Sequence, residues 1–175
     1  MNCSVHNRLM DYDLKELDAI IRIPCLYKSV DEKEIKRIIN KENDSRIRDE
    51  LLTFIIQNPN ENLLIDTTNP YKYILISTIT PYVVIDSNTF YYWIDHQRSL
   101  SSSKPFGDSQ YYVGSKMGRI AHFKFIESKY QRGSEGKQRI GITYIISSEA
   151  KTIGIGFFSP EIQDVRQYIN SIKRK

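Results

Sequence analysis

The chain has 175 residues and a mass of 20.5 kDa, with 40% hydrophobic and 26% charged residues. This size and composition suit one packed domain, or one domain with an appended segment, and they exclude collagenous and disulfide-scaffold chains. No apolar run approaches the roughly 20 residues of a membrane helix, so no membrane span is expected. The start lacks a secretory pattern and the chain has only two cysteines, Cys3 and Cys25, which together favour the reducing cytoplasm. Cys25 is interpreted as a small buried apolar side chain.

Before residue 62, apolar residues recur at helical spacing, which predicts an N-terminal helical segment over residues 1–62. A first helix is expected from Leu14 to about Ile23, where a proline follows. The spacing of hydroxyl and carboxylate in Ser29–Glu32 matches a capping box and predicts the start of a second helix. A third helix is expected between about residue 45 and residue 57, ahead of the Asn58-Pro59-Asn60 turn.

From residue 63 onward the period changes to alternation of apolar and polar residues, which predicts a mostly antiparallel sheet within 63–175. Seven strands are expected, near residues 71–78, 81–86, 89–95, 110–115, 118–129, 138–147 and 151–158, with a possible short extra strand at 63–66.

Ser159-Pro160-Glu161 combines a capping hydroxyl, a proline at the first helical position and a carboxylate, so it predicts a C-terminal amphipathic helix. The expected fold class is therefore α+β: an N-terminal helical part, a seven-stranded sheet or partly open barrel, and a C-terminal helix across it. This layout is similar to that of pleckstrin-homology-like barrels, as an analogy of topology only.

Positive charge is concentrated in the second part of the chain. Residues 1–62 hold 10 Lys and Arg against 12 Asp and Glu, whereas residues 63–175 hold 15 against 9. Seven basic residues lie in and around the hairpin 116–139: Lys116, Arg119, Lys124, Lys129, Arg132, Lys137 and Arg139. Such a hairpin can meet an acidic protein, an anionic lipid surface or nucleic acid, or it can simply be solvated and keep a sheet edge from aggregating. Tyr91 and Trp93, on the expected aromatic strand 89–95, are further candidate contacts.

Glu127-Ser128-Lys129 is the one constellation with catalytic potential. A Glu-x-Lys pair on one strand face forms the core of metal-dependent nucleases, in which the carboxylate and a second acid hold a divalent cation. Asp86 or Asp95 would supply that second ligand. The alternative is an ordinary cross-strand ion pair, and the lack of predicted helices between residues 71 and 158 argues against a nuclease fold.

The three histidines show no metal-ligand spacing, and no phosphate-binding loop or nucleophile triad is present in the sequence, so neither a metal nor a cofactor is predicted. The sequence therefore favours a non-catalytic cytoplasmic binding protein that acts through a surface on another protein, and that partner would have an acidic surface. An immunity protein that neutralises a bacterial toxin is one instance of this class. The alternatives are a nuclease centred on Glu127 and Lys129 and a lipid- or nucleic-acid-binding module that uses the basic hairpin.

Overall fold

The computed structural model describes residues 8–41, 62–69, 71–102, 110–132, 139–161 and 163–175. The larger of two antiparallel sheets is built from β3 (Tyr27–Ser29), β4 (Asn62–Asp66), β5 (Tyr73–Ile79), β6 (Gln110–Ile120), β7 (Phe123–Arg132), β8 (Arg139–Ser147) and β9 (Thr152–Ser159). The smaller sheet is built from β1 (Leu9–Leu14), β2 (Ala19–Pro24) and β10 (Lys173–Arg174). The described helices are α1 (Glu32–Lys41), α3 (Ser87–Ser102), the short α4 (Arg166–Ile169) and the 3₁₀ turn η1 (Lys15–Leu17).

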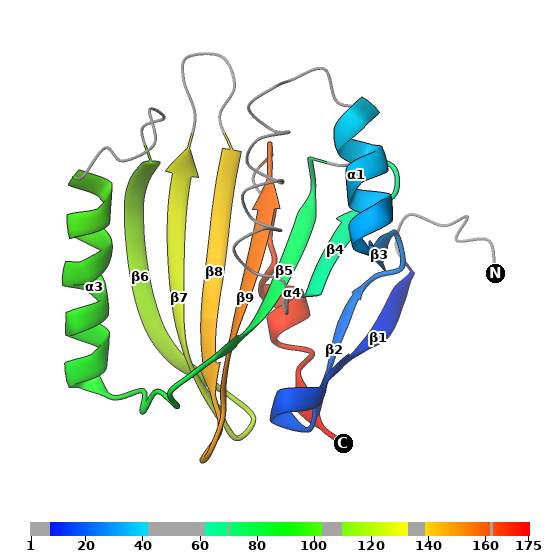
Figure 1. Ribbon diagram of the computed structural model, residues 1–175. Coiled ribbons are helices and arrows are strands. Elements are labelled where there is room, and N and C mark those ends of the chain that lie inside the picture. The colour runs from blue at the N-terminus through cyan, green and yellow to red at the C-terminus, as the bar shows by residue number, and fades with distance from the viewer. Residues whose placement is uncertain (1–7, 42–61, 70, 103–109, 133–138, 162) are drawn as a thin grey trace.

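The larger sheet has the strand order β3-β4-β5-β9-β8-β7-β6, and the smaller sheet has the order β1-β2-β10 (Figure 1). Every strand pairing is antiparallel. The predicted boundary near residue 62 falls just ahead of β4, and β3, on its N-terminal side, pairs with β4 on its C-terminal side. Likewise β10, at the end of the chain, pairs with β2 near its beginning.

The main hydrophobic core lies between the smaller sheet and one face of the larger sheet, which we call the inner face. β2 contributes Ala19, Ile21 and Ile23 to it, while β8 contributes Tyr144 and Ile146. Alternation of branched and aromatic residues along these strands directs one set of side chains into the core and leaves the other set outside.

The opposite, outer face of the larger sheet is covered by helices at its two ends. At the β3–β4 end, Ile35 of α1 packs in a cluster with Ile65 and Tyr73. At the β6–β7 end, Phe90 and Trp93 of α3 pack in a cluster built around buried residues of β7 and β8, among them Ile126 and Ile145. The sheet is therefore an open layer with a smaller sheet on one side and helices on the other.

The predicted N-terminal helical segment over residues 1–62 is wrong, because β1, β2 and β3 all lie within it. In particular, the segment from Leu14 to Ile23 forms the end of β1, then η1 and β2. Asp18 has a left-handed backbone conformation with φ 50°, which ends the short 3₁₀ turn. After it, burial alternates along Ala19–Pro24, as in a strand. Pairing with β1 and β10 therefore selects the strand over the helix that the apolar spacing had predicted.

A helix after the Ser29–Glu32 signal is confirmed as α1. Its first turn is capped by Asp31, whose Oδ1 accepts a hydrogen bond from the Glu34 backbone N–H at 2.7 Å. The third predicted helix falls on residues outside the described part of the chain.

The predicted strand at 89–95 is also wrong, because residues 87–102 form the helix α3. Its N-terminus is capped by Asp86, whose Oδ1 accepts a hydrogen bond from the Thr89 N–H at 2.8 Å. The segment expected as a strand at 81–86 is irregular and crosses the end of the outer face, where the Val83 N–H donates to Thr152 Oγ1 at 2.9 Å.

The predicted strands at 63–66, 71–78, 138–147 and 151–158 correspond to β4, β5, β8 and β9. The predicted break between 110–115 and 118–129 is misplaced, because β6 continues to Ile120 and the turn to β7 lies at residues 121–122. The predicted C-terminal amphipathic helix is wrong, since α4 has four residues and β10 follows it. Ser171 ties this end of the chain to the smaller sheet, because its Oγ accepts a hydrogen bond from the Arg22 N–H at 2.7 Å.

The partly open barrel is wrong as well. The two end strands of the larger sheet, β3 and β6, do not pair with each other or with any other described strand beyond β4 and β7, respectively.

The structure also bears on two other predictions, the environment of Cys25 and the absence of a membrane span. Cys25 is half-buried and disulfide-bonded, so it is not the simple apolar residue expected. No helix in the described residues has the length and apolar character needed to cross a membrane.

Candidate functional site

Glu127 is a buried carboxylate on the inner face of β7, with 3% of its surface exposed. The strand register places Lys116 of β6 directly opposite it on one side and Tyr144 of β8 directly opposite it on the other. Lys116 Nζ lies 3.0 Å from Glu127 Oε2, and the Tyr144 hydroxyl donates to the same oxygen at 2.5 Å. These three residues form a polar row across three neighbouring strands, which we call the Glu127 cluster.

The two partners of Glu127 differ in their exposure to solvent. The Lys116 side chain is 45% exposed, so its ammonium reaches the carboxylate from the solvent side. The pKa of Tyr144 is raised well above 10.0, first by burial and then by its hydrogen bond to Glu127 and the charge of that carboxylate, while Arg166 acts in the opposite direction. The Tyr144 hydroxyl is therefore held in its protonated, hydrogen-bond-donating form.

The Glu127 cluster links the side chains of β6, β7 and β8 at one end of the larger sheet. Its groups are those of a structural ion pair and hydrogen bond, and they do not form a set of metal ligands. One ammonium and one hydroxyl engage the same oxygen of Glu127. No group of three or more His, Cys, Asp or Glu side chains that could hold a metal ion occurs within the described residues. The Glu127 cluster joins β6, β7 and β8 on the side away from α3.

We expect the protein to lose stability as the pH rises above about 10. Five tyrosines have pKa values raised from 10.0, with burial as the first cause: Tyr12, Tyr27, Tyr130, Tyr144 and Tyr168. Above this pH the unfolded chain loses tyrosine protons that the folded state retains, so stability present below the unfolded pKa is lost progressively. Urea denaturation at a series of alkaline pH values measures the loss, and a free energy of unfolding that stays constant through this range would contradict it.

The structure does not bring the predicted nuclease residues together. Lys129 lies on the same face of β7 as Glu127, opposite Gly114 and Ile142, as strand alternation predicts. The predicted second acids lie elsewhere. Asp86 caps α3, and its hydrogen bonds with Thr89 lower its pKa. Asp95 lies exposed on α3, 4.0 Å from Arg98.

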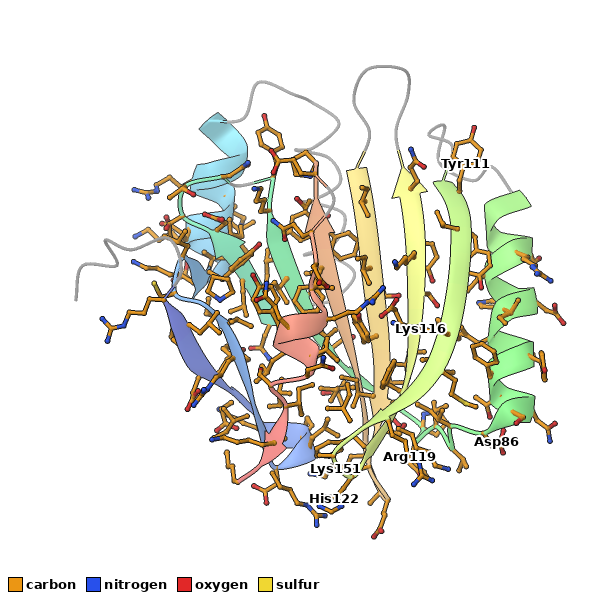
Figure 2. The ribbon with its side chains drawn as sticks, turned by 180° about the vertical axis from the view of Figure 1, so that it is seen from behind. Asp86, Tyr111, Lys116, Arg119, His122 and Lys151 are labelled. Carbon is orange, nitrogen blue, oxygen red and sulfur yellow. The ribbon has the colours of Figure 1, made fainter. Side chains whose placement is uncertain are left out.

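The basic residues of the predicted hairpin are divided between the two faces of the sheet. Lys116 lies on the inner face, whereas Lys124 lies on the outer face, where its Nζ donates to the Ile85 carbonyl at 3.1 Å. Arg119 is directly opposite Lys124 and is exposed (Figure 2). Lys137 and the side chains of Arg132 and Arg139 are outside the described part of the structure.

α3 is anchored to the outer face by two side-chain hydrogen bonds. The Trp93 Nε1–H donates to Ser128 Oγ at 2.9 Å, and the Tyr130 hydroxyl donates to Gln97 Oε1 at the same distance. Trp93 is thus a packing residue, whereas Tyr91, the other predicted aromatic contact, is 66% exposed.

Large exposed apolar side chains gather on α3 and β6. Of the nine such residues in the described part of the chain, five lie on these two neighbouring elements. They are Tyr91 (66% exposed), Tyr92 (72%), Tyr111 (60%), Val113 (63%) and Met117 (42%), and we call them the α3–β6 surface. This surface wraps around the end of the sheet, because Tyr111 lies opposite Gln131 on the inner face and Met117 lies opposite Ile126 on the outer face. Figure 1 shows α3 beside β6 at one end of the sheet, and Figure 2 shows Tyr111 near the upper end of β6.

Sequence reasoning found only Tyr91 of this surface. Reading residues 89–95 as a strand hid Tyr92, because alternation would place it on the buried side. The signal was present at helical spacing, since Phe90, Trp93 and Gln97 face the sheet while Tyr91 and Tyr92 face away.

No protein-family model and no curated protein matches this sequence. Solved structures do resemble the fold. A cyanobacterial PsbP protein, CyanoP from Synechocystis, has a TM-score of 0.57 and 9% identity, and the match covers 100% of this chain and 97% of that protein. A protein from Bacteroides thetaiotaomicron has a TM-score of 0.51 and 9% identity; the match covers 90% of this chain but only 45% of the Bacteroides chain. At this identity the likenesses show the fold alone.

Proposed function

We propose that the protein is a non-catalytic binding protein that acts on another protein through the α3–β6 surface. The observation that supports this proposal is the concentration of five of the nine large exposed apolar residues on two adjacent elements. Tyrosine is enriched in protein interfaces because its rigid ring buries a large area while its hydroxyl still makes hydrogen bonds. Three of the five residues are tyrosines, and two of these lie side by side on α3.

The charge around this surface favours a partner with acidic groups. β6 and β7 carry Lys116, Arg119, Lys124 and Lys129 among their described side chains, and Glu127 is the one described carboxylate on these two strands. Glu127 is already paired with Lys116. Arg119 makes no ion pair or side-chain hydrogen bond with the described residues, so its charge is available to a partner.

A toxin-neutralising immunity protein in the cytoplasm is the specific instance that we propose. Such a protein works by covering a surface of its target and needs no catalytic group of its own. The disulfide at Cys25 argues against a cytoplasmic location, because disulfides persist mainly in oxidising compartments. Thiol titration of protein isolated from its native host tests the location: reduced cysteines support the cytoplasm, and an intact disulfide contradicts it.

The surface itself is tested by affinity capture from the native host with wild-type protein and the double variant Tyr91→Ser/Tyr92→Ser. Because truncation of central aromatic contacts commonly costs 2 kcal/mol or more each, capture of the partner should fall by at least about tenfold.

A matched control is Leu9→Ser/Met10→Ser, which removes two adjacent exposed apolar side chains from β1, at the other end of the molecule (Figure 1). This control should capture the partner as the wild type does. Equal capture by all three proteins would contradict the proposed surface.

A further inference from the structure

β1 is an end strand of the smaller sheet, and we call its side away from β2 the free edge. It has six residues and pairs only with β2 among the described strands. Figure 1 shows no described helix or strand along the free edge, in contrast to β6, which α3 contacts. Edge strands present backbone N–H and C=O groups that can pair with another chain. β1 is therefore a template for an added strand.

Alternate residues of β1 direct their backbone groups toward the free edge. The Cys25 N–H donates to the Arg8 carbonyl at 2.9 Å, so the residue pair just ahead of β1 is a hydrogen-bonded one. Because such pairs alternate along antiparallel strands, the odd-numbered residues of β1 turn their N–H and C=O groups away from β2. The Arg22 N–H agrees with this pattern, since it bonds to Ser171 on the β10 side instead of to Asp11 opposite it. The outward-facing groups belong to Leu9, Asp11 and Asp13.

A cavity of about 350 Å³ lies under β1 beside the free edge. Residues of β1, η1, β4, β5 and β9 line it, whereas no residue of β2 does. Three of the lining residues, Leu14, Ile76 and Ile153, are apolar and buried. An engineered apolar cavity of roughly 150 Å³ is large enough to bind benzene. This cavity therefore has room for one aromatic side chain of an added strand.

Polar groups at the mouth of the cavity favour a tyrosine as that side chain. Asn62 of β4 and Thr78 of β5 line the cavity and are exposed, and neither makes a side-chain hydrogen bond to another described residue. A tyrosine ring can contact the apolar floor while its hydroxyl donates to or accepts from these two side chains.

The charges that line the cavity favour an uncharged occupant. Asp13 pairs with Lys175 at 2.7 Å, and Glu16 pairs with Lys151 at 3.6 Å. Lys15 is exposed to solvent, so its ammonium remains hydrated. No carboxylate or ammonium of the lining is thus left buried and uncompensated.

A second copy of this chain does not suit the site. The inward side chains of its own β1, Tyr12 and Leu14, pack in the core against its own larger sheet, so they cannot enter the cavity of another copy. In the two registers that pair most of β1, Asp11 would also lie opposite Asp11 or Asp13 of the other copy. Like charges directly opposite each other destabilise strand pairing. The occupant is therefore a segment of a different protein.

We infer that β1 binds an extended, uncharged segment of another protein as an added strand of the smaller sheet, with a tyrosine of that segment in the cavity. In β-strand addition, backbone hydrogen bonds supply affinity and alternate side chains supply specificity. The residues on either side of the tyrosine at a spacing of two are apolar, because they face the same side as Met10, which is 44% exposed. This site is separate from the α3–β6 surface and takes a second ligand.

The test uses the capped peptide Lys-Thr-Val-Thr-Tyr-Thr-Val-Thr-Lys as probe, in which the terminal lysines serve solubility, and a control peptide with serine in place of tyrosine. Each peptide is titrated into isotope-labelled protein while backbone amide shifts and hydrogen exchange are recorded by NMR. We expect the tyrosine peptide to slow exchange of the outward-facing amides of Leu9, Asp11 and Asp13, and the serine peptide to bind at least about tenfold more weakly. Absence of binding, or shifts confined to other elements, would overturn the inference.

The variant Asp11→Pro removes one outward-facing N–H and keeps the hydrogen bonds between β1 and β2, as prolines on edge strands do. It should weaken binding of the tyrosine peptide by about tenfold. Asp11→Asn is the matched control, because it loses the same ion pair with Arg22 but keeps the N–H, and it should bind the peptide as the wild type does. Equal binding by the two variants would contradict strand addition, as would a dimer of the protein alone with protected β1 amides.

The cavity is tested by Thr78→Trp, which places a large ring at its mouth and should remove the preference for the tyrosine peptide over the serine peptide. Thr67→Trp, at an exposed threonine beyond the other end of β4, should retain that preference. A preference that survives Thr78→Trp would contradict the role of the cavity. Tyr91→Ser/Tyr92→Ser should leave peptide binding unchanged, so this site and the α3–β6 surface are tested separately.

Discussion

Replacing Glu127 with alanine should lower the free energy of unfolding by roughly 3 kcal/mol. The substitution removes a buried carboxylate that joins β6 to β8, and it leaves the buried Tyr144 hydroxyl without the acceptor that it has at 2.5 Å. A cavity also remains where the side chain packed. The Lys116 ammonium can regain water because its side chain is 45% exposed, so it contributes less to the loss. Urea denaturation monitored by circular dichroism measures the change.

Two conservative variants separate the contributions within the Glu127 cluster. Glu127→Gln keeps an oxygen that can accept from Tyr144, whereas Lys116→Met removes only the half-exposed ammonium and keeps an apolar stem. We expect Glu127→Gln to cost about 1 kcal/mol. Lys116→Met should cost more, roughly 2 kcal/mol, because it leaves the buried Glu127 carboxylate without its counter-charge. If Glu127→Ala were no more destabilising than Glu127→Gln, the side chain at position 127 would not be the one that joins these strands.

Replacing Trp93 with alanine is expected to lower the free energy of unfolding by roughly 3 kcal/mol, because it leaves a cavity between α3 and the outer face of the sheet. Trp93 packs in the cluster that contains Ile126 and Ile145, and its indole N–H donates to Ser128. Trp93→Phe keeps most of the packing but loses the hydrogen bond, so we expect about 1 kcal/mol for that variant. Chemical denaturation of the wild type, Trp93→Phe and Trp93→Ala measures their free energies of unfolding, which should decrease in that order.

The wild-type protein provides an independent check of this packing, because Trp93 is its one tryptophan. In the folded state the indole is half-buried, so its fluorescence emission should shift to longer wavelength on unfolding. It should shift together with the loss of secondary structure in a cooperative transition. Emission already typical of a fully exposed indole in the folded protein would contradict the position of α3.

Strands β8 and β9 could be predicted because their buried and exposed residues alternate without a competing period, whereas the turn between β6 and β7 was misplaced. Ile142, Tyr144 and Ile146 of β8 all enter the core, as the sequence indicates. β2 was ambiguous, since Leu14, Leu17 and Ile21 also fit a helical stripe. Only pairing with β1 and with the distant β10 selects the strand there.

α3 was missed for a different reason. Its aromatic residues have high strand propensity, and propensity is outweighed when a helix can be capped and packed. Asp86 supplies the cap, and Phe90 and Trp93 supply the packing against the sheet. The packing contribution depends on the outer face of the folded sheet, so the local sequence of residues 87–102 does not reveal it.

The partners of Glu127 in the Glu127 cluster could not be predicted either, because they lie on neighbouring strands. Strand alternation predicts that Glu127 and Lys129 share a face, but it cannot say which residues lie opposite them. The register of β6, β7 and β8 places Lys116 and Tyr144 there, and Lys116 lies 3.0 Å from the carboxylate. Glu127 therefore forms a cross-strand ion pair with a lysine of β6, which is the alternative that the sequence left open beside a nuclease centre.

The most direct test of the central claim, that the protein binds its partner through the α3–β6 surface, is hydrogen exchange of the protein alone and in complex with the partner captured from its host. We predict slower exchange in α3 and β6 on binding, with unchanged exchange in β1 and β2 on the smaller sheet. Protection that appears on the smaller sheet and leaves α3 and β6 unchanged would contradict the claim.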